Sequence, residues 1–239
     1  MKLYSENEKA SMAMAVDPVL RQLLQQVIRD ERIESVVETG TYLGLGSTTL
    51  VAQAFAPDSP PRSFVTIEAN YSSWMEARKN LARLSFVKPL WGLSVRLDEA
   101  QAFLAADECL RDHSRWPEIF IDDDRDPLSF YSAEVRGQLG GIANAADASK
   151  YEGEDLLRRE LRAASGRRLL VVLDSAGGTG FLEFSILQAE CANRPFVLML
   201  DDVHHLKHFR SLLAVRSDPR FTELGSDIEN GWLLTRCSP

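Results

Sequence analysis

Cysteine is scarce in this chain of 239 residues, and its placement excludes two common uses. The three cysteines, Cys109, Cys191 and Cys237, lie far apart and show no Cys-x-x-Cys spacing. Neither a disulfide framework nor a structural zinc site is therefore indicated. We expect the three thiols to be reduced, as they are in cytoplasmic proteins.

Long apolar runs and an excess of positive charge are also missing. No stretch approaches the ~18 apolar residues that a membrane-spanning helix needs, and the N-terminus has no basic segment followed by an apolar core. The formal net charge is -8, and basic residues occur only in scattered pairs, which disfavours a nucleic-acid partner. We expect a soluble cytoplasmic protein with a small-molecule partner, and its oligomeric state stays open.

Residues 36–50 carry the most informative pattern, Val-Val-Glu-Thr-Gly-Thr-Tyr-Leu-Gly-Leu-Gly-Ser-Thr-Thr-Leu. An apolar run ends at Glu38, glycines follow at Gly40, Gly44 and Gly46, and a helix-compatible segment begins at Ser47. This order is typical of a strand, a tight glycine turn and a helix that together bind a nucleotide. The simpler alternative is a strand-to-helix turn that binds no ligand.

The acid at the mouth of this turn separates two kinds of ligand. A pyrophosphate on the helix N-terminus would be repelled by the carboxylate of Glu38. S-adenosylmethionine (SAM) carries an ammonium and a sulfonium, and its carboxylate can use the free amides after Gly44. The pattern Glu-x-Gly-x-x-x-Gly-x-Gly resembles motif I of the class I SAM-dependent methyltransferases.

A second acid, Glu68, ends the next predicted strand at residues 63–67. A carboxylate roughly twenty residues past the glycines, on the adjacent strand, can accept both ribose hydroxyls of an adenosine. The alternative is a solvated acid at a strand end. Together with Glu38 and the glycine turn, the pattern favours ribose binding.

Strand-like and helix-like segments alternate along most of the chain. We expect strands near residues 36–38, 63–67, 87–90, 169–173 and 196–200, and helices near 17–28, 47–55, 72–84, 97–111 and 181–192. The alternation indicates a parallel sheet with right-handed crossovers. Residues 221–224 and 231–236, with a polar turn between them, indicate a final antiparallel hairpin.

The chain divides into an N-terminal arm, residues 1–16, and a single domain, residues 17–239. Between about residues 113 and 168 the alternation breaks, which indicates an inserted lid or substrate-recognition segment. An acidic run there contains Asp122, Asp123, Asp124 and Asp126. Its residues are too close together for alternating metal ligands, so we predict a solvated turn.

Acids also follow the later strands, at Asp174, Asp201 and Asp202. Ligands of open α/β sheets bind beyond the carboxyl ends of the strands, so these acids should share one rim with Glu38 and Glu68. Five carboxylates on one rim repel one another unless a cation lies between them. SAM and a divalent metal each supply positive charge.

Five short motifs now extend the resemblance over most of the chain outside the arm and the insertion. They are Glu38-Thr-Gly-Thr-Tyr-Leu-Gly, Ile67-Glu68-Ala-Asn70, Gly92-Leu-Ser94, Leu173-Asp174 and Leu200-Asp201-Asp202. They resemble the motifs of the metal-dependent catechol-type and sugar O-methyltransferases. The resemblance implies a Rossmann-like fold with a mostly parallel seven-stranded sheet, a C-terminal antiparallel hairpin and a lid.

The same resemblance implies roles for individual residues. The methionine part of SAM would be held by Glu38, Gly40, Tyr42 and Gly44, the ribose by Glu68 and the adenine by Ser94. Thr41 and Ala69 would also bind the cofactor. Magnesium would be ligated by Asp174, Asp201 and Asp202, with Asp174 also near the reacting centre and the cofactor. A divalent cation lowers the pKa of an acceptor hydroxyl and orients it toward the methyl group.

The general base departs from the pattern. Catechol-type enzymes place a lysine three residues after the first metal acid, where this chain has Gly177. The nearest replacements are His204 and His205, and either could be a base or a ligand, in which case a softer metal than magnesium is conceivable. Alternatively, the acids and histidines only cap a strand end and a helix start.

Three functions remain under comparison. The first is a SAM-dependent O-methyltransferase of a small hydroxylated metabolite, with assistance from a divalent metal. The second is a methyltransferase-like fold with altered or lost chemistry, such as a metal-dependent hydroxylase-like enzyme or a cofactor-binding regulatory module. The third, an NAD-linked dehydrogenase, is disfavoured by Glu38 and by the terminal hairpin.

Overall fold

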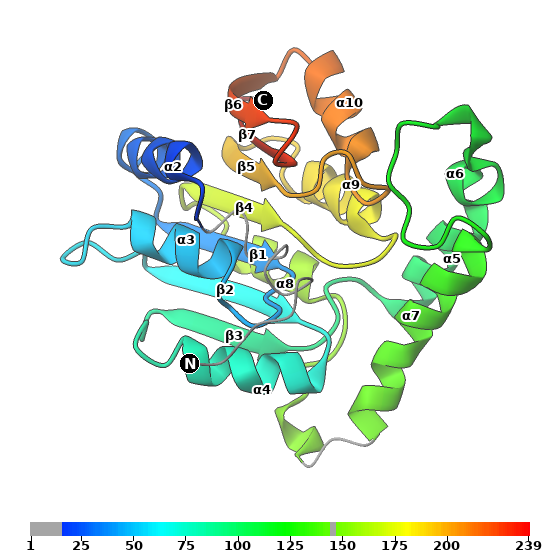
Figure 1. Cartoon of the computed structure of the whole chain (residues 1–239). Helices are drawn as coiled ribbons and strands as arrows, with labels where there is room; N and C mark the ends of the chain where they lie inside the picture. The colour runs from blue at the N-terminus through cyan, green and yellow to red at the C-terminus, as the bar shows by residue number, and fades with distance from the viewer. Residues whose placement is uncertain (1–15, 144–146) are drawn as a thin grey trace.

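A seven-stranded sheet with helices on both faces forms the body of the molecule (Figure 1). The computed structural model describes residues 16–143 and 147–239, so the predicted arm, except its last residue, lies outside the described part. The strands are β1 (Ser35–Thr39), β2 (Ser63–Glu68), β3 (Val87–Trp91), β4 (Leu169–Leu173), β5 (Phe196–Leu200), β6 (Phe221–Asp227) and β7 (Trp232–Cys237).

The strand order is β3-β2-β1-β4-β5-β7-β6. Strands β1 to β5 run parallel, and β7 enters antiparallel between β5 and β6. This is the expected Rossmann-like arrangement with its terminal antiparallel hairpin. The strand order reverses between β1 and β4, which is where open α/β sheets place their ligands.

The central strands form because their residues are apolar on both faces. All five residues of β4 and of β5 are buried, as their continuous Leu, Val, Phe and Met sequences predict. Alternate residues face opposite sides: Val36 joins one apolar cluster and Val37 the other. The sheet is therefore covered on both sides, and its carboxyl edge is left for a site.

Nine α-helices are described: α2 (Pro18–Asp30), α3 (Ser47–Ala54), α4 (Tyr71–Asn80), α5 (Leu97–Ala106), α6 (Glu108–Arg111), α7 (Pro127–Ala143), α8 (Leu156–Ala163), α9 (Gly180–Glu190) and α10 (Phe209–Ser217). Residues of α2, α3 and α4 pack in the first apolar cluster, and residues of α5, α7, α8 and α9 pack in the second. None of the helices in the described ranges is both long and apolar enough to cross a bilayer.

The first helix begins as its sequence indicates. The Asp17 side chain accepts hydrogen bonds from the amides of Val19, at 2.8 Å, and Leu20, at 3.1 Å. Its other oxygen accepts from the indole of Trp232 in β7 at 2.9 Å. Helix capping and tertiary contact thus use the two oxygens of one carboxylate.

The prediction of one continuous helix over residues 97–111 is wrong in one respect. The helix breaks at Asp107 into α5 and α6. The Asp107 side chain accepts from the amide of Cys109 and caps the new helix. It also forms an ion pair with Arg210, which begins α10 together with Phe209. A contact with residues a hundred positions away therefore sets this boundary.

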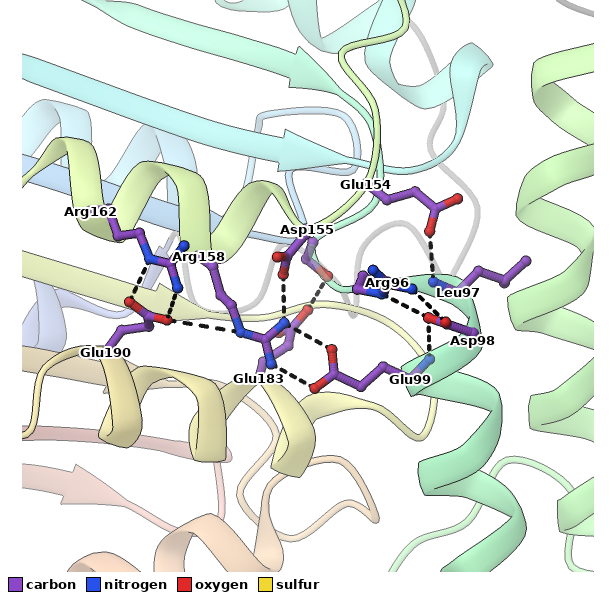
Figure 2. Close-up of polar contacts among 11 residues, drawn as sticks. Arg96, Leu97, Asp98, Glu99, Glu154, Asp155, Arg158, Arg162, Glu183 and Glu190 are labelled. Atoms are coloured by element: carbon purple, nitrogen blue, oxygen red, sulfur yellow. Dashed lines mark hydrogen bonds and ion pairs between the residues drawn. The ribbon is translucent and has the colours of Figure 1, made fainter.

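The segment at residues 113–168 lies in two places. Helix α7 stands with α5 and α6 on the side toward which the strand arrows of β1 and β4 point (Figure 1). Helix α8 packs instead against the sheet, with Leu157 and Leu161 buried in the second apolar cluster. Arg158 of α8 forms an ion pair with Glu99 of α5, with Nη2 2.6 Å from Oε1 (Figure 2). It forms a second ion pair with Asp155, with Nη1 2.7 Å from Oδ1.

Candidate functional site

A cavity of about 900 Å³ opens at the carboxyl edge of the sheet. The glycine turn after β1 and the loops after β2, β3, β4 and β5 line it, and α7 forms the opposite wall. Small-molecule sites typically measure roughly 300–1,000 Å³. The cavity thus has room for a nucleoside and a second small molecule.

The glycine turn needs the conformations that glycine allows. Gly40 has a φ of +87°, and a Cβ there would lie 2.1 Å from the main-chain oxygen of Asp174. Gly44 has a φ of +71°, with Leu81 against it. Even Tyr42, between them, has a φ of +48°. The backbone therefore turns tightly and passes close to the end of β4.

Glu38 lies in β1, just before the glycine turn. The side chain is fully buried and does not line the cavity. Its carboxylate accepts hydrogen bonds from the hydroxyls of Ser47 and Thr48, each at 2.7 Å, and so joins β1 to the first turn of α3. Burial raises the pKa of Glu38 to about 7. Glu38 therefore supports the turn from β1, and its contact with the methionine part stays a prediction.

Glu68 lies in the cavity wall at the end of β2, as predicted. Its carboxylate accepts from the main-chain amides of Tyr42 and Asn70, each at 2.7 Å. Burial raises its pKa to about 7 although these amides favour the charged form. Thr41 and Ala69 line the cavity beside it. The structure therefore brings together most of the residues predicted for the methionine part and the ribose.

Ser94 also lines the cavity, but its hydroxyl points elsewhere. It donates to the carboxylate of Glu183, a fully buried residue of α9. Glu183 accepts in addition from Thr39, at 2.7 Å, and from Ser175, at 2.8 Å. The hydroxyl predicted to bind adenine is thus part of a clamp that joins the end of β1 to the loops after β3 and β4.

The three acids predicted to bind metal do converge. Asp174 follows β4, Asp201 and Asp202 follow β5, and one carboxylate oxygen of each lies within 4.8 Å of the others. Burial and the charge of Asp174 raise the pKa of Asp201 well above its ordinary value. Asp202 has a φ of +52°, an uncommon backbone conformation that aspartate tolerates.

Lys207, which the sequence patterns did not indicate, supplies a cation to this cluster. Its Nζ lies 3.1 Å from Oδ1 of Asp174 and 2.9 Å from Oδ2 of Asp202, and its side chain is 6% exposed. Burial opposes its charge, but the neighbouring aspartates raise the pKa of Lys207 well above its usual range. The charged form of Lys207 is therefore favoured by the two aspartates that it contacts.

The donor atoms of this cluster bear on whether it can hold a divalent metal ion. Three carboxylates suit a hard cation such as magnesium. However, the Lys207 ammonium already engages Asp174 and Asp202, which are two of the three ligands. As arranged, these residues do not fit a divalent ion.

Both ring nitrogens of His205 are engaged. Nδ1 accepts from the main-chain amide of Lys207, so Nε2 carries the hydrogen and faces Oδ2 of Asp122, each at 3.1 Å. The hydroxyl of Tyr131 donates to the same Asp122 oxygen at 2.8 Å. Asp122, expected in a solvated turn, thus fixes the histidine, and its pKa is lowered mainly by that hydrogen bond. His204 lies in the cavity wall near Gly231.

Helix α7 presents a carboxylate to the cavity. Oε2 of Glu134 is buried and has no hydrogen-bond partner among the described residues. Burial raises the pKa of Glu134. Two aromatic side chains that line the same cavity, Phe120 and Phe130, are 58% and 39% exposed. This side of the cavity thus combines apolar rings with the carboxylates of Glu134 and Asp122.

Comparison with known proteins gives matches at the level of structure. No family model and no curated protein matches the sequence. An O-methyltransferase from Bacillus cereus, solved with S-adenosylhomocysteine (SAH), has a TM-score of 0.50 and 15% identity over 96% of this chain and 86% of its own. At this identity the likeness concerns the fold, and the chain has the Rossmann-like class I methyltransferase fold.

Two further solved structures give lower scores. The O-methyltransferase of tomaymycin synthesis from Streptomyces achromogenes, solved with SAM, has a TM-score of 0.48 and 15% identity over 100% of this chain and 92% of its own. An SAH-bound methyltransferase from Podospora anserina has a TM-score of 0.48 and 10% identity over 98% and 83%.

Proposed function

We propose that this chain is a SAM-dependent methyltransferase whose acceptor is a small hydroxylated molecule. The observation that carries the proposal is Glu68, a carboxylate held by two main-chain amides at the end of β2 and lining a cavity beside a tight glycine turn. An acid in this position suits the two hydroxyls of a ribose. The class I methyltransferase fold and the neighbours solved with SAM or SAH support the same function.

The residues around the turn fit the remaining parts of SAM. Amides of the turn would meet the carboxylate of the methionine part, and Asp174, which lines the cavity, would meet its ammonium. Leu93 and Val95 provide apolar contacts for the adenine. When bound, SAM supplies an electrophilic methyl group on its sulfonium. The residues of this chain hold the donor and bring the acceptor in line with it.

The acceptor would enter between this donor site and α7. Phe120 and Phe130 offer apolar surface, while Glu134 and Asp122 offer carboxylates. An acceptor with an apolar body and a hydroxyl satisfies both parts of this wall. A hydroxyl that donates to Glu134 would also satisfy its buried Oε2.

Glu134 is the base that we assign to the reaction. A hydroxyl attacks a methyl group only as its proton leaves, and Oε2 of Glu134 is positioned to receive that proton. The raised pKa of Glu134 improves its basicity. The histidine hypothesis survives in His204, since neutral His205 has both nitrogens engaged and would need to break a contact first.

No step is assigned to a divalent cation. The proposal that Asp174, Asp201 and Asp202 use one would require Lys207 to leave its contacts with two of them. A second candidate function follows from these departures. The chain has Gly177 where catechol-type enzymes have a lysine, and it has Lys207 among the three aspartates. Both departures favour a related fold with altered chemistry, such as a cofactor-binding regulatory module.

Methyl transfer is tested by incubating the chain with labelled SAM and a panel of small phenols, sugars and amines. Formation of SAH together with an acceptor that gains one methyl group supports the first function, and the position of the methyl separates oxygen from nitrogen. Tight SAH binding without turnover on any acceptor class would favour the regulatory module. Absence of SAH binding would reject both.

A further inference from the structure

The main chain around Lys207 is held by contacts on two sides. The residue follows a tight turn in which the amide of His205 donates to the carbonyl of Asp202 at 2.9 Å. The start of α9 packs closely against the main chain of Lys207, since a Cβ on Gly180 would lie 2.6 Å from the carbonyl oxygen of Lys207. With its main chain fixed in this way, the side chain extends directly into the acidic cluster.

The ammonium and a divalent ion would compete for the same two carboxylates, those of Asp174 and Asp202. Oδ1 of Asp174 and Oδ2 of Asp202 lie at hydrogen-bonding distance from Nζ, and the Asp201 carboxylate completes a site only 4.8 Å wide. Magnesium and calcium bind carboxylate oxygens at ~2.0–2.6 Å. An ion bound to both acids would lie close to the ammonium that contacts the same carboxylates, and the repulsion between the two cations disfavours their binding together.

We propose that Lys207 is the resident cation of this cluster and takes the place of a divalent metal ion. A fixed ammonium neutralises Asp174 and Asp202 and holds the ends of β4 and β5 together beside the cavity. The inference deepens the proposed function, on which its catalytic consequence rests. That consequence is methyl transfer that neither needs added metal nor loses rate with a chelator.

The test measures metal binding in the absence of SAM and acceptor. Mn²⁺ is titrated into the full chain while free ion is followed by electron paramagnetic resonance, and Mg²⁺ is titrated by calorimetry. The variants are Lys207→Met, which removes the charge and keeps an unbranched side chain shorter by one atom, and Lys207→Arg, which keeps the charge. Lys88→Met, at an exposed lysine of β3, is the matched control. SAH binding is measured separately on every variant.

The wild-type chain, Lys207→Arg and Lys88→Met should bind no Mn²⁺ at the cluster up to millimolar concentration. Lys207→Met should bind one ion with a dissociation constant at least about tenfold lower than any wild-type value. Adding Asp202→Asn to Lys207→Met should abolish this binding.

Stoichiometric, micromolar Mn²⁺ binding to the wild type, lost in Asp202→Asn, would overturn the inference, as would a folded Lys207→Met variant that binds no ion. Should Lys207→Met fail to fold, the wild-type titration decides alone. Because SAH binding is a separate readout, loss of the proposed function and loss of this inference can be told apart.

Discussion

Oε2 of Glu134 lies 2.8 Å from the point that a Cβ on Gly177 would occupy. The main chain at Gly177 is in the left-handed region, with a φ of +84°, three residues after Asp174. A carboxylate from α7 thus takes the room that a side chain at residue 177 would need. Catechol-type enzymes carry a lysine at the position of Gly177. In this chain the carboxylate of Glu134, from the opposite wall of the cavity, lies beside that position.

This relationship makes Glu134→Gln the most informative variant for catalysis. The change keeps the shape of the side chain and removes its ability to accept a proton. We expect kcat to fall by about 100-fold or more, which is typical for loss of a general base. The SAH dissociation constant, measured by calorimetry, should stay within about twofold of wild type.

Glu118→Gln is the matched control, because Glu118 is an exposed acid in the same segment and does not line the cavity. It should leave kcat unchanged. If His204→Ala reduces kcat more than Glu134→Gln does, then His204 is the base and the assignment to Glu134 is wrong.

Cofactor binding should depend on pH through Glu68, whose pKa is raised to about 7 by burial. Ribose hydroxyls donate to the ionised carboxylate, so the proton must leave before they bind. SAH affinity is therefore full above pH 7 and weakens as the pH falls, by up to about tenfold per unit. Calorimetric titrations between pH 5.5 and 8.5 measure this slope, and circular dichroism checks that the protein is folded at each pH.

Glu68→Gln carries no titrating group and should bind SAH more weakly, with a flat profile through the same pH range. Proton release on binding, read from the heat in two buffers of different ionisation enthalpy, should disappear in this variant. A wild-type profile as flat as that of Glu68→Gln would remove Glu68 from the ribose site.

The hydrogen bonds of the buried Glu183 carboxylate should contribute strongly to the free energy of unfolding. Its carboxylate accepts from the hydroxyls of Thr39, Ser94 and Ser175, and Glu183→Ala leaves all three without this acceptor. We expect a loss of about 2–4 kcal/mol in the free energy of unfolding. Denaturant unfolding followed by circular dichroism measures it.

Glu190→Ala, on the same helix, is the control for α9. Glu190 pairs with Arg162 near the surface, and such pairs contribute at most about 1 kcal/mol. Equal losses in the two variants would show that the buried clamp has no special weight.

Gly40 and Gly166 separate steric contact from backbone strain. Both have positive φ, but a Cβ on Gly40 would lie 2.1 Å from the oxygen of Asp174, whereas nothing lies within 4 Å of a Cβ on Gly166. Gly166→Ala should cost about 1 kcal/mol, from strain alone. Gly40→Ala should cost several times as much and weaken SAH binding, and thermal melts with and without SAH measure both.

Much of the fold was predictable because its signals are local. The continuous apolar residues of β4 and β5, and the Asp17-Pro18 start of α2, define these elements without help from the rest of the chain. Helix α7 was not expected, because its glycines suggest a loop, yet Tyr131 and Val135 bury one side of it. Helix α10, which starts after the tight turn at Lys207, was also not expected.

The site was predictable in position but less so in detail. Acids at the ends of parallel strands must share an edge, so the meeting of Asp174, Asp201 and Asp202 follows from the pattern. Where each side chain points depends on how the turns between these residues fold. The hydroxyls that contact Glu38 lie in the same glycine-rich stretch, and Lys207 lies shortly after Asp202, but the sequence pattern alone does not show that these side chains meet.

We propose that the cavity beside the glycine turn binds the adenosine part of SAM. Calorimetric titration of the full chain with SAH tests this most directly. We predict one site per chain with a micromolar dissociation constant, weakened at least about tenfold by Glu68→Ala. No heat and no thermal protection at millimolar SAH, or stronger protection by a nicotinamide dinucleotide, would contradict the account.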